Sequence, residues 1–399
     1  MKKSVEDLAI FGGAAAFENP LHVGRPNIGD RQKLLDRFQD MLDRRWFSND
    51  GPYVRSFEQA LGAYLGVGHC IAVCNATVGL EIAAHALGLS GEVIVPSFTF
   101  VATAHALQWL NIVPVFCDID ERSHSLDPAQ IEPLITSRTS GIVGVHVWGE
   151  PCPVDEIQAI AARHRLRTIY DSAHAFGCSY KGRMLGGEGD AEVFSFHATK
   201  FLNSFEGGVI TTNSDEIATR ARLMRNFGFS GYDQVDALGT NGKMTEICAV
   251  MGLTSLESID SFIDCNRTNY GRYRDQLSRV EGLRLYPYDP SEKRNYQYVI
   301  LEVDLPGQVL SRDDVQRILQ AENVLARRYF YPGCHQMEPY RSTMPDAGLR
   351  LPATQRLVKR VLSLPTGPNV APAQVEKICD LLRFVAENRE AVARRLGKA

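Results

Sequence analysis

Short apolar runs that alternate with helix-like segments constrain the fold of this chain more than any other feature of its sequence. Seven such runs, rich in β-branched residues, occupy residues 71–74, 92–96, 114–120, 141–148, 168–171, 192–196 and 207–212. Strands separated by helical segments are typical of a mostly parallel sheet that is covered by helices on both faces. The sequence therefore predicts an α/β domain built on a mostly parallel seven-stranded sheet.

The remaining residues predict a second, smaller α+β domain, because 399 residues exceed what one hydrophobic core ordinarily serves. Residues 244–277 space their apolar side chains helically over an unusual length, and we expect one helix there that bridges the two domains. A strand and two further helices are predicted at residues 295–305, 311–323 and 371–396. We expect a large domain over residues 30–262, and a small domain formed by residues 1–29 together with 263–399.

The composition favours small molecules, or a second copy of the chain, as partners. Lysine and arginine number 43 against 47 acidic residues, and the basic residues are scattered, which predicts no nucleic-acid or membrane surface. The nine cysteines form no C-x-x-C pair and no zinc-like spacing with the ten histidines, so no metal site is predicted. Residues 1–13 make a poor signal peptide and no long uncharged apolar window exists, so we expect a soluble, cytoplasmic protein.

One lysine, Lys200, lies between a strand-like run and a glycine pair in the stretch FSFHATKFLNSFEGG, residues 194–208. A lysine at a strand end is ordinarily a solvated residue at the rim of the fold. Chemistry that uses an amine as a covalent carrier needs a lysine, an acid that holds a proton on a cofactor ring, and a phosphate cradle. Gly207 and Gly208 are expected to let the chain turn tightly beside such a cofactor.

The candidate acid is Asp171, the last residue of a predicted strand and 29 positions before Lys200. Open α/β sheets place their ligands at the carboxyl ends of their strands. A strand-end aspartate is about as often a helix cap, and that alternative remains open here. In pyridoxal phosphate enzymes, a buried carboxylate keeps the pyridine nitrogen protonated, and aspartate suits this role because it remains ionised against a pyridinium.

The candidate phosphate cradle follows the first predicted strand, where Asn75, Ala76 and Thr77 begin a helix. A helix N-terminus offers free N–H groups and the positive end of its dipole to phosphate, and Thr77 adds a hydroxyl. The alternative is that Asn75 or Thr77 only caps the helix. Ser195, five residues before Lys200, is a candidate for a further hydroxyl on the same phosphate.

Aromatic candidates follow the predicted strand at residues 92–96, where Phe98 and Phe100 precede a helix. Either ring could stack on a flat cofactor, although packing in the core is the ordinary role of phenylalanine. His174, three residues after Asp171, is a candidate for hydrogen bonding or stacking on the opposite face of the ring; the alternative is a core histidine.

Taken together, these pieces resemble the DegT-type family of nucleotide-sugar aminotransferases, which are pyridoxal phosphate enzymes of the aspartate aminotransferase fold, fold type I. The resemblance extends through nearly the whole chain. Ordered blocks at residues 44–67, 74–77, 93–107, 114–120, 171–177, 194–208, 239–253 and 327–340 carry it. The last block reads RRYFYPGCHQMEPY, and the block at 239–253 reads GTNGKMTEICAVMGL.

The resemblance implies a role for each candidate. Lys200 forms the Schiff base with pyridoxal 5′-phosphate, Asp171 pairs with the pyridine nitrogen, and the cofactor's other contacts are Ala76, Thr77 and Ser195 on the phosphate and Phe100 on the ring. Asn241 reaches the phosphate of the neighbouring subunit, which implies a homodimer with shared sites; a turn residue is its alternative. His174 stands where the family commonly has glutamine, which leaves its contact to the phenolic oxygen of the cofactor open. Relatives that carry histidine in place of the lysine are dehydratases, and Lys200 argues against that branch.

The resemblance also implies the reaction: transfer of the amino group of L-glutamate to a nucleotide-linked keto-sugar. The FEGG text at residues 205–208 and the block at 327–340 resemble enzymes that act at C4 of a 4-keto-6-deoxyhexose, and dTDP-4-keto-6-deoxy-D-glucose is the favoured substrate. Candidate contacts to the sugar, the diphosphate or a carboxylate are Arg327 or Arg328, Tyr331 and His335.

Three alternatives to this interpretation differ in what they require of the sequence. A C3 aminotransferase of a 3-keto-6-deoxy sugar nucleotide has the same fold. A non-catalytic regulator that binds pyridoxal phosphate on the same scaffold is disfavoured by the complete set of Lys200, Asp171 and Ser195. A nicotinamide dehydrogenase would need a G-x-G-x-x-G turn after the first strand, and VCNATVG at residues 73–79 lacks it.

Overall fold

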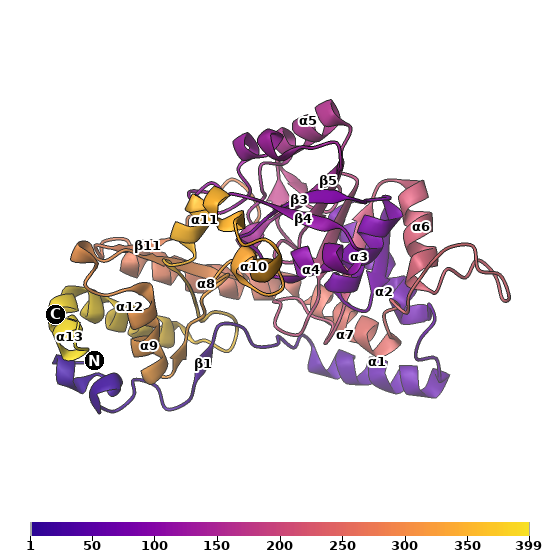
Figure 1. Ribbon diagram of the computed structural model, residues 1–399. Coiled ribbons are helices and arrows are strands. Elements are labelled where there is room, and N and C mark those ends of the chain that lie inside the picture. The colour runs from indigo at the N-terminus through magenta and orange to yellow at the C-terminus, as the bar shows by residue number, and fades with distance from the viewer. Residues whose placement is uncertain (1, 399) are drawn as a thin grey trace.

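A seven-stranded sheet forms the centre of the larger part of the molecule in the computed structural model, which describes residues 2–398 (Figure 1). Its strand order is β2-β10-β9-β6-β5-β3-β4, and only β10 runs antiparallel to its neighbours. The strands are β2 (His69–Val73), β3 (Glu92–Pro96), β4 (Val113–Cys117), β5 (Thr139–Val145), β6 (Arg167–Asp171), β9 (Ala191–Ser195) and β10 (Gly208–Thr212). The prediction of a mostly parallel α/β sheet is confirmed.

Helices cover both faces of this sheet because successive strand residues point to opposite sides. Val93 and Val95 join a cluster with α3 (Ala76–Ala86), α4 (Ala102–Trp109) and α6 (Asp215–Arg225), whereas Ile94 joins α5 (Val154–His164) on the other face. Farther along that second face, α2 (Pro52–Leu65) and α7 (Glu246–Glu257) pack on β2, β9 and β10. Burial on both faces explains why these strands read as continuous apolar runs.

The predicted single helix at residues 244–277 is two helices, α7 and α8 (Ile259–Leu277), so that expectation was wrong. Ser258 separates them, with φ −105° and ψ 6°, and its N–H donates to the carbonyl of Ser255. Its hydroxyl contacts the chain at Gly29, where a Cβ atom would lie 2.4 Å from the Ser258 Oγ. The predicted bridge is α8, because its first turns pack in the cluster of the large sheet and its last turns in the cluster of the smaller domain.

The smaller domain is built on an antiparallel sheet of β11 (Leu283–Leu285), β12 (Val299–Val303) and β14 (Val361–Leu364). Its helix α9 (Arg312–Ala321) begins at Ser311, which forms a capping box with Asp314, as the serine N-cap predicted. The predicted terminal helix is divided at Asn388 into α12 (Pro372–Glu387) and α13 (Arg389–Arg395). The remaining elements are α1 (Arg31–Arg44), α10 (Tyr340–Thr343), α11 (Pro352–Leu357), β1 (Leu21–His22), β7 (Ser179–Tyr180), β8 (Arg183–Met184) and β13 (Val324–Leu325).

The N-terminal segment packs on the smaller domain, and both chain ends lie there in Figure 1. β1 pairs in parallel with β13, and the buried carboxylate of Glu322 accepts the N–H groups of Ala9 and Ala16. These contacts agree with a small domain of residues 1–29 and 263–399 beside a large domain of 30–262, a division that we keep as a proposal; Met1 and Ala399 lie outside the described residues. Among residues 2–398, no helix has the length and apolar character needed to cross a membrane.

Candidate active site

Lys200 lies in the loop that leads from β9 back into β10. The loop is fastened to the N-terminal segment, because the side chain of Asn27 donates to the carbonyl of Phe201 at 2.8 Å. The Nζ atom of Lys200 is 3.3 Å from the hydroxyl oxygen of Tyr298. Burial lowers the pKa of Lys200 to about 8, against the opposing effect of the Asp171 charge. A larger fraction of this amine is therefore neutral near physiological pH than of an exposed lysine, as a nucleophile or base requires.

Asp171 ends β6, which lies beside β9, so the sheet brings the acid to the same edge as Lys200. One carboxylate oxygen accepts the hydroxyl of Thr103 at 2.7 Å, and the other accepts the N–H of Ala173 at 3.1 Å. Burial raises the pKa of Asp171, while these hydrogen bonds and the nearby Lys200 charge lower it. A buried carboxylate of this kind is stabilised by a cationic partner, such as a protonated pyridine.

The predicted phosphate cradle forms where β2, β9 and β10 meet. Asn75 caps α3 by accepting the N–H of Val78 at 2.9 Å, so Ala76 and Thr77 are the first two helical residues. The first N–H groups of a helix have no partner within it. Gly208 pairs with Ser195 on one side and Val73 on the other, and a Cβ atom on Gly208 would lie 2.8 Å from the Ala76 nitrogen. The first helix amides, the Ser195 residue and the bare Gly208 thus lie side by side, and amides at a helix N-terminus suit a phosphate group.

The two glycines serve close approach and not a tight turn, which corrects the sequence interpretation. Gly207 and Gly208 are absent from the positive-φ residues of this loop, whereas Phe205 has φ 61°. A Cβ atom on Gly207 would lie 2.1 Å from the Ser204 Oγ and 2.7 Å from the Met244 Cε, so a side chain there would require both to move.

His174 is buried and neutral, because burial lowers its pKa well below the ordinary value. Its ring lies 5.8 Å from that of Trp148, 5.8 Å from that of Phe330 and 4.3 Å from that of Tyr298. The backbone N–H of Trp148 donates to the His174 Nδ1 at 3.3 Å. Since a backbone N–H can only donate, Nδ1 is an acceptor and the proton of the neutral ring is on Nε2. His174 therefore offers a hydrogen-bond donor at Nε2.

The two phenylalanines after β3 differ in environment. Phe98 is fully buried and packs edge-on against Trp148 and Phe330, so its role is in the core. Phe100 is 59% exposed and lines a cavity beside Lys200. Of the two rings, Phe100 is the one free to stack on a flat ligand.

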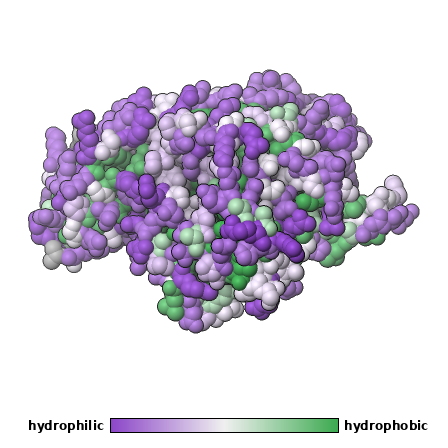
Figure 2. Space-filling model, turned by 90° about the horizontal axis from the view of Figure 1, so that it is seen from above, coloured by the Kyte–Doolittle hydropathy of each residue, from purple (hydrophilic) through white to green (hydrophobic). Residues whose placement is uncertain are grey.

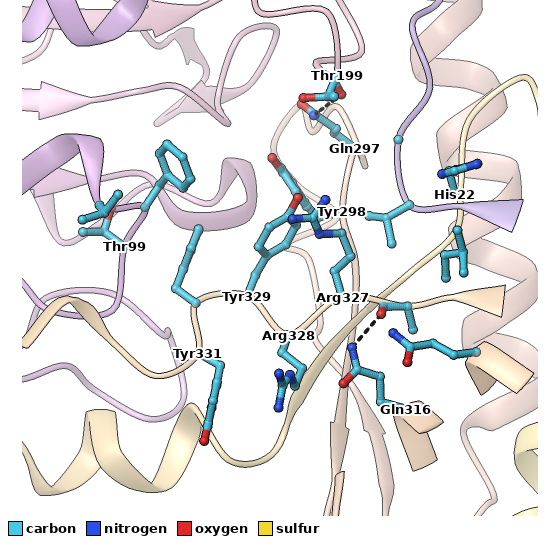
Figure 3. A pocket seen from close by; sticks show the side chains of 18 of the residues that line it. His22, Thr99, Thr199, Gln297, Tyr298, Gln316, Arg327, Arg328, Tyr329 and Tyr331 are labelled. Carbon is cyan, nitrogen blue, oxygen red and sulfur yellow. Dashed lines mark hydrogen bonds between the residues drawn. The ribbon is translucent and has the colours of Figure 1, made fainter. Parts of the chain in front are cut away.

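That cavity has a volume of about 560 Å³ and lies between the large domain, the smaller domain and the N-terminal segment (Figure 3). Thr199 and Phe100 line it from the large domain, and His22 lines it from β1. The smaller domain contributes Tyr298, Arg327, Arg328, Tyr329 and Tyr331. The opening beside Lys200 is thus shared between the two domains.

Two adjacent arginines in this cavity differ in their partners. Arg328 is 3.2 Å from the carboxylate of Asp313 and lies over the ring of Tyr331. Arg327 lies over the ring of Tyr329 and forms no ion pair with any carboxylate of residues 2–398. The guanidinium of Arg327 is therefore the one available to an anionic ligand.

Two predicted residues lie elsewhere. His335 is 2% exposed, its Nδ1 is 2.7 Å from the Ser97 Oγ, and it does not line the cavity, so its assignment to substrate binding does not fit. Asn241 is exposed in the loop between α6 and α7, where its side-chain oxygen accepts the Lys243 ammonium at 2.7 Å. Tyr298, which contacts Lys200, was not predicted, because an aromatic residue within a predicted strand is ordinarily part of the core.

Comparison with known proteins identifies relatives along almost the whole chain. The sequence profile of the DegT/DnrJ/EryC1/StrS aminotransferase family matches residues 29–383. The dTDP-4-amino-4,6-dideoxy-D-glucose transaminase of Shigella dysenteriae is 34% identical over 371 residues, which cover 92% of this chain and 100% of the relative. The GDP-perosamine synthase of Caulobacter vibrioides is 33% identical over 362 residues, which cover 90% and 96%. A crystal structure of DesI in the presence of its TDP-sugar product is 48% identical, with a TM-score of 0.92 over 98% of this chain and 100% of that chain.

Proposed function

The chain belongs to the DegT/DnrJ/EryC1/StrS aminotransferase family and is a pyridoxal-phosphate-dependent aminotransferase of nucleotide sugars, and we propose that it moves the amino group of L-glutamate to C4 of dTDP-4-keto-6-deoxy-D-glucose. The predictions of family, fold, enzyme class and cofactor are confirmed. The choice of a dTDP-linked sugar is supported by the 48% identity to DesI, whose structure contains a TDP-sugar product. The choice of C4 is supported by the name of the Shigella dysenteriae relative.

The observation that carries the proposal is the meeting of Lys200 and Asp171 at one sheet edge beside the cavity. When bound, pyridoxal phosphate supplies an aldehyde that attaches to Lys200 and a ring that accepts electrons from the substrate. We assign the phosphate to the amides of Ala76 and Thr77 and to the hydroxyl of Ser195, around the bare Gly208.

The remaining cofactor contacts are assigned from the charges and hydrogen-bond donors of the site. Asp171, oriented by the Thr103 hydroxyl, holds its negative charge toward the ring nitrogen. His174 offers its Nε2–H to the phenolic oxygen, the contact that the family commonly makes with glutamine. Phe100 covers one face of the ring. Lys200, once displaced by the amino donor, takes a proton from the donor's α-carbon and gives it up again at the neighbouring carbon.

Arg327 is the proposed receptor for the anionic part of the substrate. Its guanidinium is free of carboxylates, while Arg328 is held by Asp313. A guanidinium binds both carboxylate and diphosphate in a bidentate manner, so Arg327 suits either the donor glutamate or the sugar nucleotide. Tyr331, 40% exposed at the cavity, remains a candidate contact to the sugar.

We also propose a homodimer with shared sites. Exposed apolar side chains gather around the projecting loop between α6 and α7, and Figure 2 shows hydrophobic atoms at its base on the right of the view. They are Trp46, Phe47, Phe227, Phe229, Tyr232, Val235, Leu238 and Ile247. Patches of this kind mark interaction surfaces. Asn241 lies in the same loop, which supports its proposed contact to the cofactor phosphate of a second copy.

A cytoplasmic location is proposed as well, supported by nine cysteines that form no disulfide within residues 2–398.

The deciding experiment incubates the purified holoenzyme with L-glutamate and dTDP-4-keto-6-deoxy-D-glucose, and locates the new nitrogen by NMR. Nitrogen at C4 of the dTDP sugar supports the proposal. Turnover only with a 3-keto sugar, or only with a GDP-linked 4-keto sugar, contradicts it and identifies the alternative. Lys200→Ala is the control, because it should remove turnover with every sugar.

A further inference from the structure

Tyr298 provides the hydrogen-bond partner of the Lys200 amine. Its hydroxyl oxygen lies 3.3 Å from Nζ, and the two residues are 98 positions apart in the sequence. Tyr298 comes directly before β12 in the smaller domain, whereas Lys200 belongs to the large domain. Figure 3 shows the Tyr298 side chain extending into the cavity. The contact therefore joins the two domains at the atom on which the chemistry depends.

The hydroxyl of Tyr298 has a fixed position. Its ring is buried, packs on His174 with centroids 4.3 Å apart, and lies 5.4 Å from Trp148 and 6.1 Å from Tyr329. Its backbone carbonyl accepts the hydroxyl of Tyr288 at 2.8 Å. A ring packed on several sides has lost its rotamer freedom on folding, so little order remains to be imposed when a ligand binds.

Tyr298 is also a neutral phenol at physiological pH, because burial raises its pKa well above the ordinary value. A neutral phenol can accept an N–H from a lysine amine without taking its proton. A free lysine side chain, by contrast, is flexible along a four-carbon stem. A hydrogen-bond acceptor at a fixed point holds the Lys200 amine in one place. Only one N–H of Nζ is used in this bond, so the rest of the amine remains available for proton exchange.

Resting on the proposed function, we propose that Tyr298 is a further catalytic residue, which holds the Lys200 amine in position after the amino donor has displaced it. The C–H bond at the donor's α-carbon breaks, its electron pair is left to the bound cofactor, and the proton goes to Nζ. Nζ would then release a proton to the cofactor carbon that carries the amino group, where the stored electron pair forms the new C–H bond, and Nζ returns to the neutral amine. The phenol keeps its own proton and accepts an N–H from Nζ in both steps.

The alternative is that Tyr298 is a core aromatic residue whose hydroxyl contacts Lys200 without affecting the rate of proton transfer. Tyr298→Phe separates the two, because it removes only the hydroxyl and leaves the ring contacts with His174 and Trp148 in place. Tyr296→Phe is the matched control: it lies two residues earlier, packs on Tyr270 and does not line the cavity.

The first measurement is the glutamate half-reaction of the holoenzyme, followed by stopped-flow absorbance of the cofactor with ordinary and 2-deuterated L-glutamate. In Tyr298→Phe we expect the rate to fall by about 10- to 100-fold and the isotope effect to rise, because proton transfer becomes slower than the other steps. The dissociation constant of the cofactor and the KM for glutamate should stay within about threefold of wild type. Tyr296→Phe should match wild type in the rate, the isotope effect, the dissociation constant of the cofactor and the KM for glutamate.

The second measurement needs no bound cofactor. The cofactor-free proteins are labelled briefly with acetic anhydride across a pH range, and modification of the Lys200 peptide is read by mass spectrometry. We expect the labelling midpoint to move to lower pH in Tyr298→Phe, since the phenol oxygen favours the protonated amine that donates to it.

Two results overturn the proposal. One is an unchanged rate and isotope effect in Tyr298→Phe together with an unchanged labelling profile. The other is a rate loss matched by an equal loss of cofactor affinity, which shows a packing role. If wild-type enzyme fails to react with glutamate at all, the proposed amino donor is wrong, and the labelling profile then decides alone whether Tyr298 holds the amine.

Discussion

Replacing Gly208 by alanine tests the phosphate cradle, because the added methyl group presses against Ala76, whose amide is proposed to bind the cofactor phosphate. The Cβ atom would lie 2.8 Å from the Ala76 nitrogen and 2.8 Å from the Phe194 carbonyl oxygen, about 0.6 Å closer than ordinary contacts allow. Both neighbours are backbone atoms, one at the start of α3 and one inside the β9–β10 ladder, so neither can rotate away. The helix N-terminus must move back from the phosphate.

The magnitude follows from the contacts at stake. A hydrogen bond to a charged group contributes about 1.5–3 kcal/mol, and about 1.4 kcal/mol is a factor of ten in affinity. Losing one amide contact to phosphate should therefore raise the dissociation constant of pyridoxal phosphate about 10- to 100-fold. Crowding in the sheet should also lower the free energy of unfolding by about 1–3 kcal/mol.

The assay is an absorbance titration of the cofactor-free protein with pyridoxal phosphate and, separately, with pyridoxal, which lacks the phosphate. Gly208→Ala should weaken the first and leave the second nearly unchanged. Gly62→Ala is the control, because a Cβ atom there would lie 3.6 Å from its nearest neighbour, which is ordinary contact. Equal weakening of both ligands, or wild-type affinity for pyridoxal phosphate in folded Gly208→Ala, would refute the assignment of the cradle.

Three further predictions follow. Attachment of pyridoxal phosphate to Lys200 should accelerate as pH rises through about 8 and level off about one to two pH units above that value, because the lowered pKa sets the fraction of neutral amine; a stopped-flow pH series checks this. Arg327→Ala should raise the KM of one substrate about tenfold or more in steady-state assays, whereas Arg328→Ala, whose guanidinium is already paired, should raise it less; equal effects would contradict the distinction. Replacing both Tyr232 and Leu238 by serine should increase the monomer fraction in analytical ultracentrifugation, and an unchanged mass would place the dimer interface elsewhere.

The sequence was sufficient for the central sheet and for the residues at its edge. Strands buried on both faces are continuous apolar runs, and such runs are visible without any alignment. Asp171 and Ser195 each end a parallel strand, so they were bound to reach the same edge. That β6 and β9 are direct neighbours in the sheet is a matter of strand order, which the chain order does not reveal.

Contacts between distant segments were out of reach. Tyr298 meets Lys200 only because β12 of the smaller domain packs against the lysine loop, and no local pattern encodes that approach. Arg327 and Arg328 are neighbours in sequence, and only the position of Asp313 on α9 decides which guanidinium is free. The break at Ser258 was missed because neither glycine nor proline marks it, and buried apolar residues such as Leu253 and Phe262 continue on either side of it.

The two sides of the cavity are built with different rigidity, and this bears on which sugars the scaffold accepts. Of the proposed phosphate contacts, Ser195 lies in a row of the sheet with Gly208 and Val73, and Ala76 and Thr77 begin α3 shortly after Val73, so the cofactor side is anchored to ladder hydrogen bonds. Arg327 and Tyr331 lie in a connection after β13 that has a single bridge, from Arg327 to Ser363. We expect that substitutions in the connection after β13 can alter the side of the cavity that faces the substrate without moving the sheet row of Ser195, Gly208 and Val73. Relatives at 34% and 33% identity to this chain carry a dTDP-sugar name and a GDP-sugar name, and we expect nucleotide choice to depend on the connection and not on the sheet.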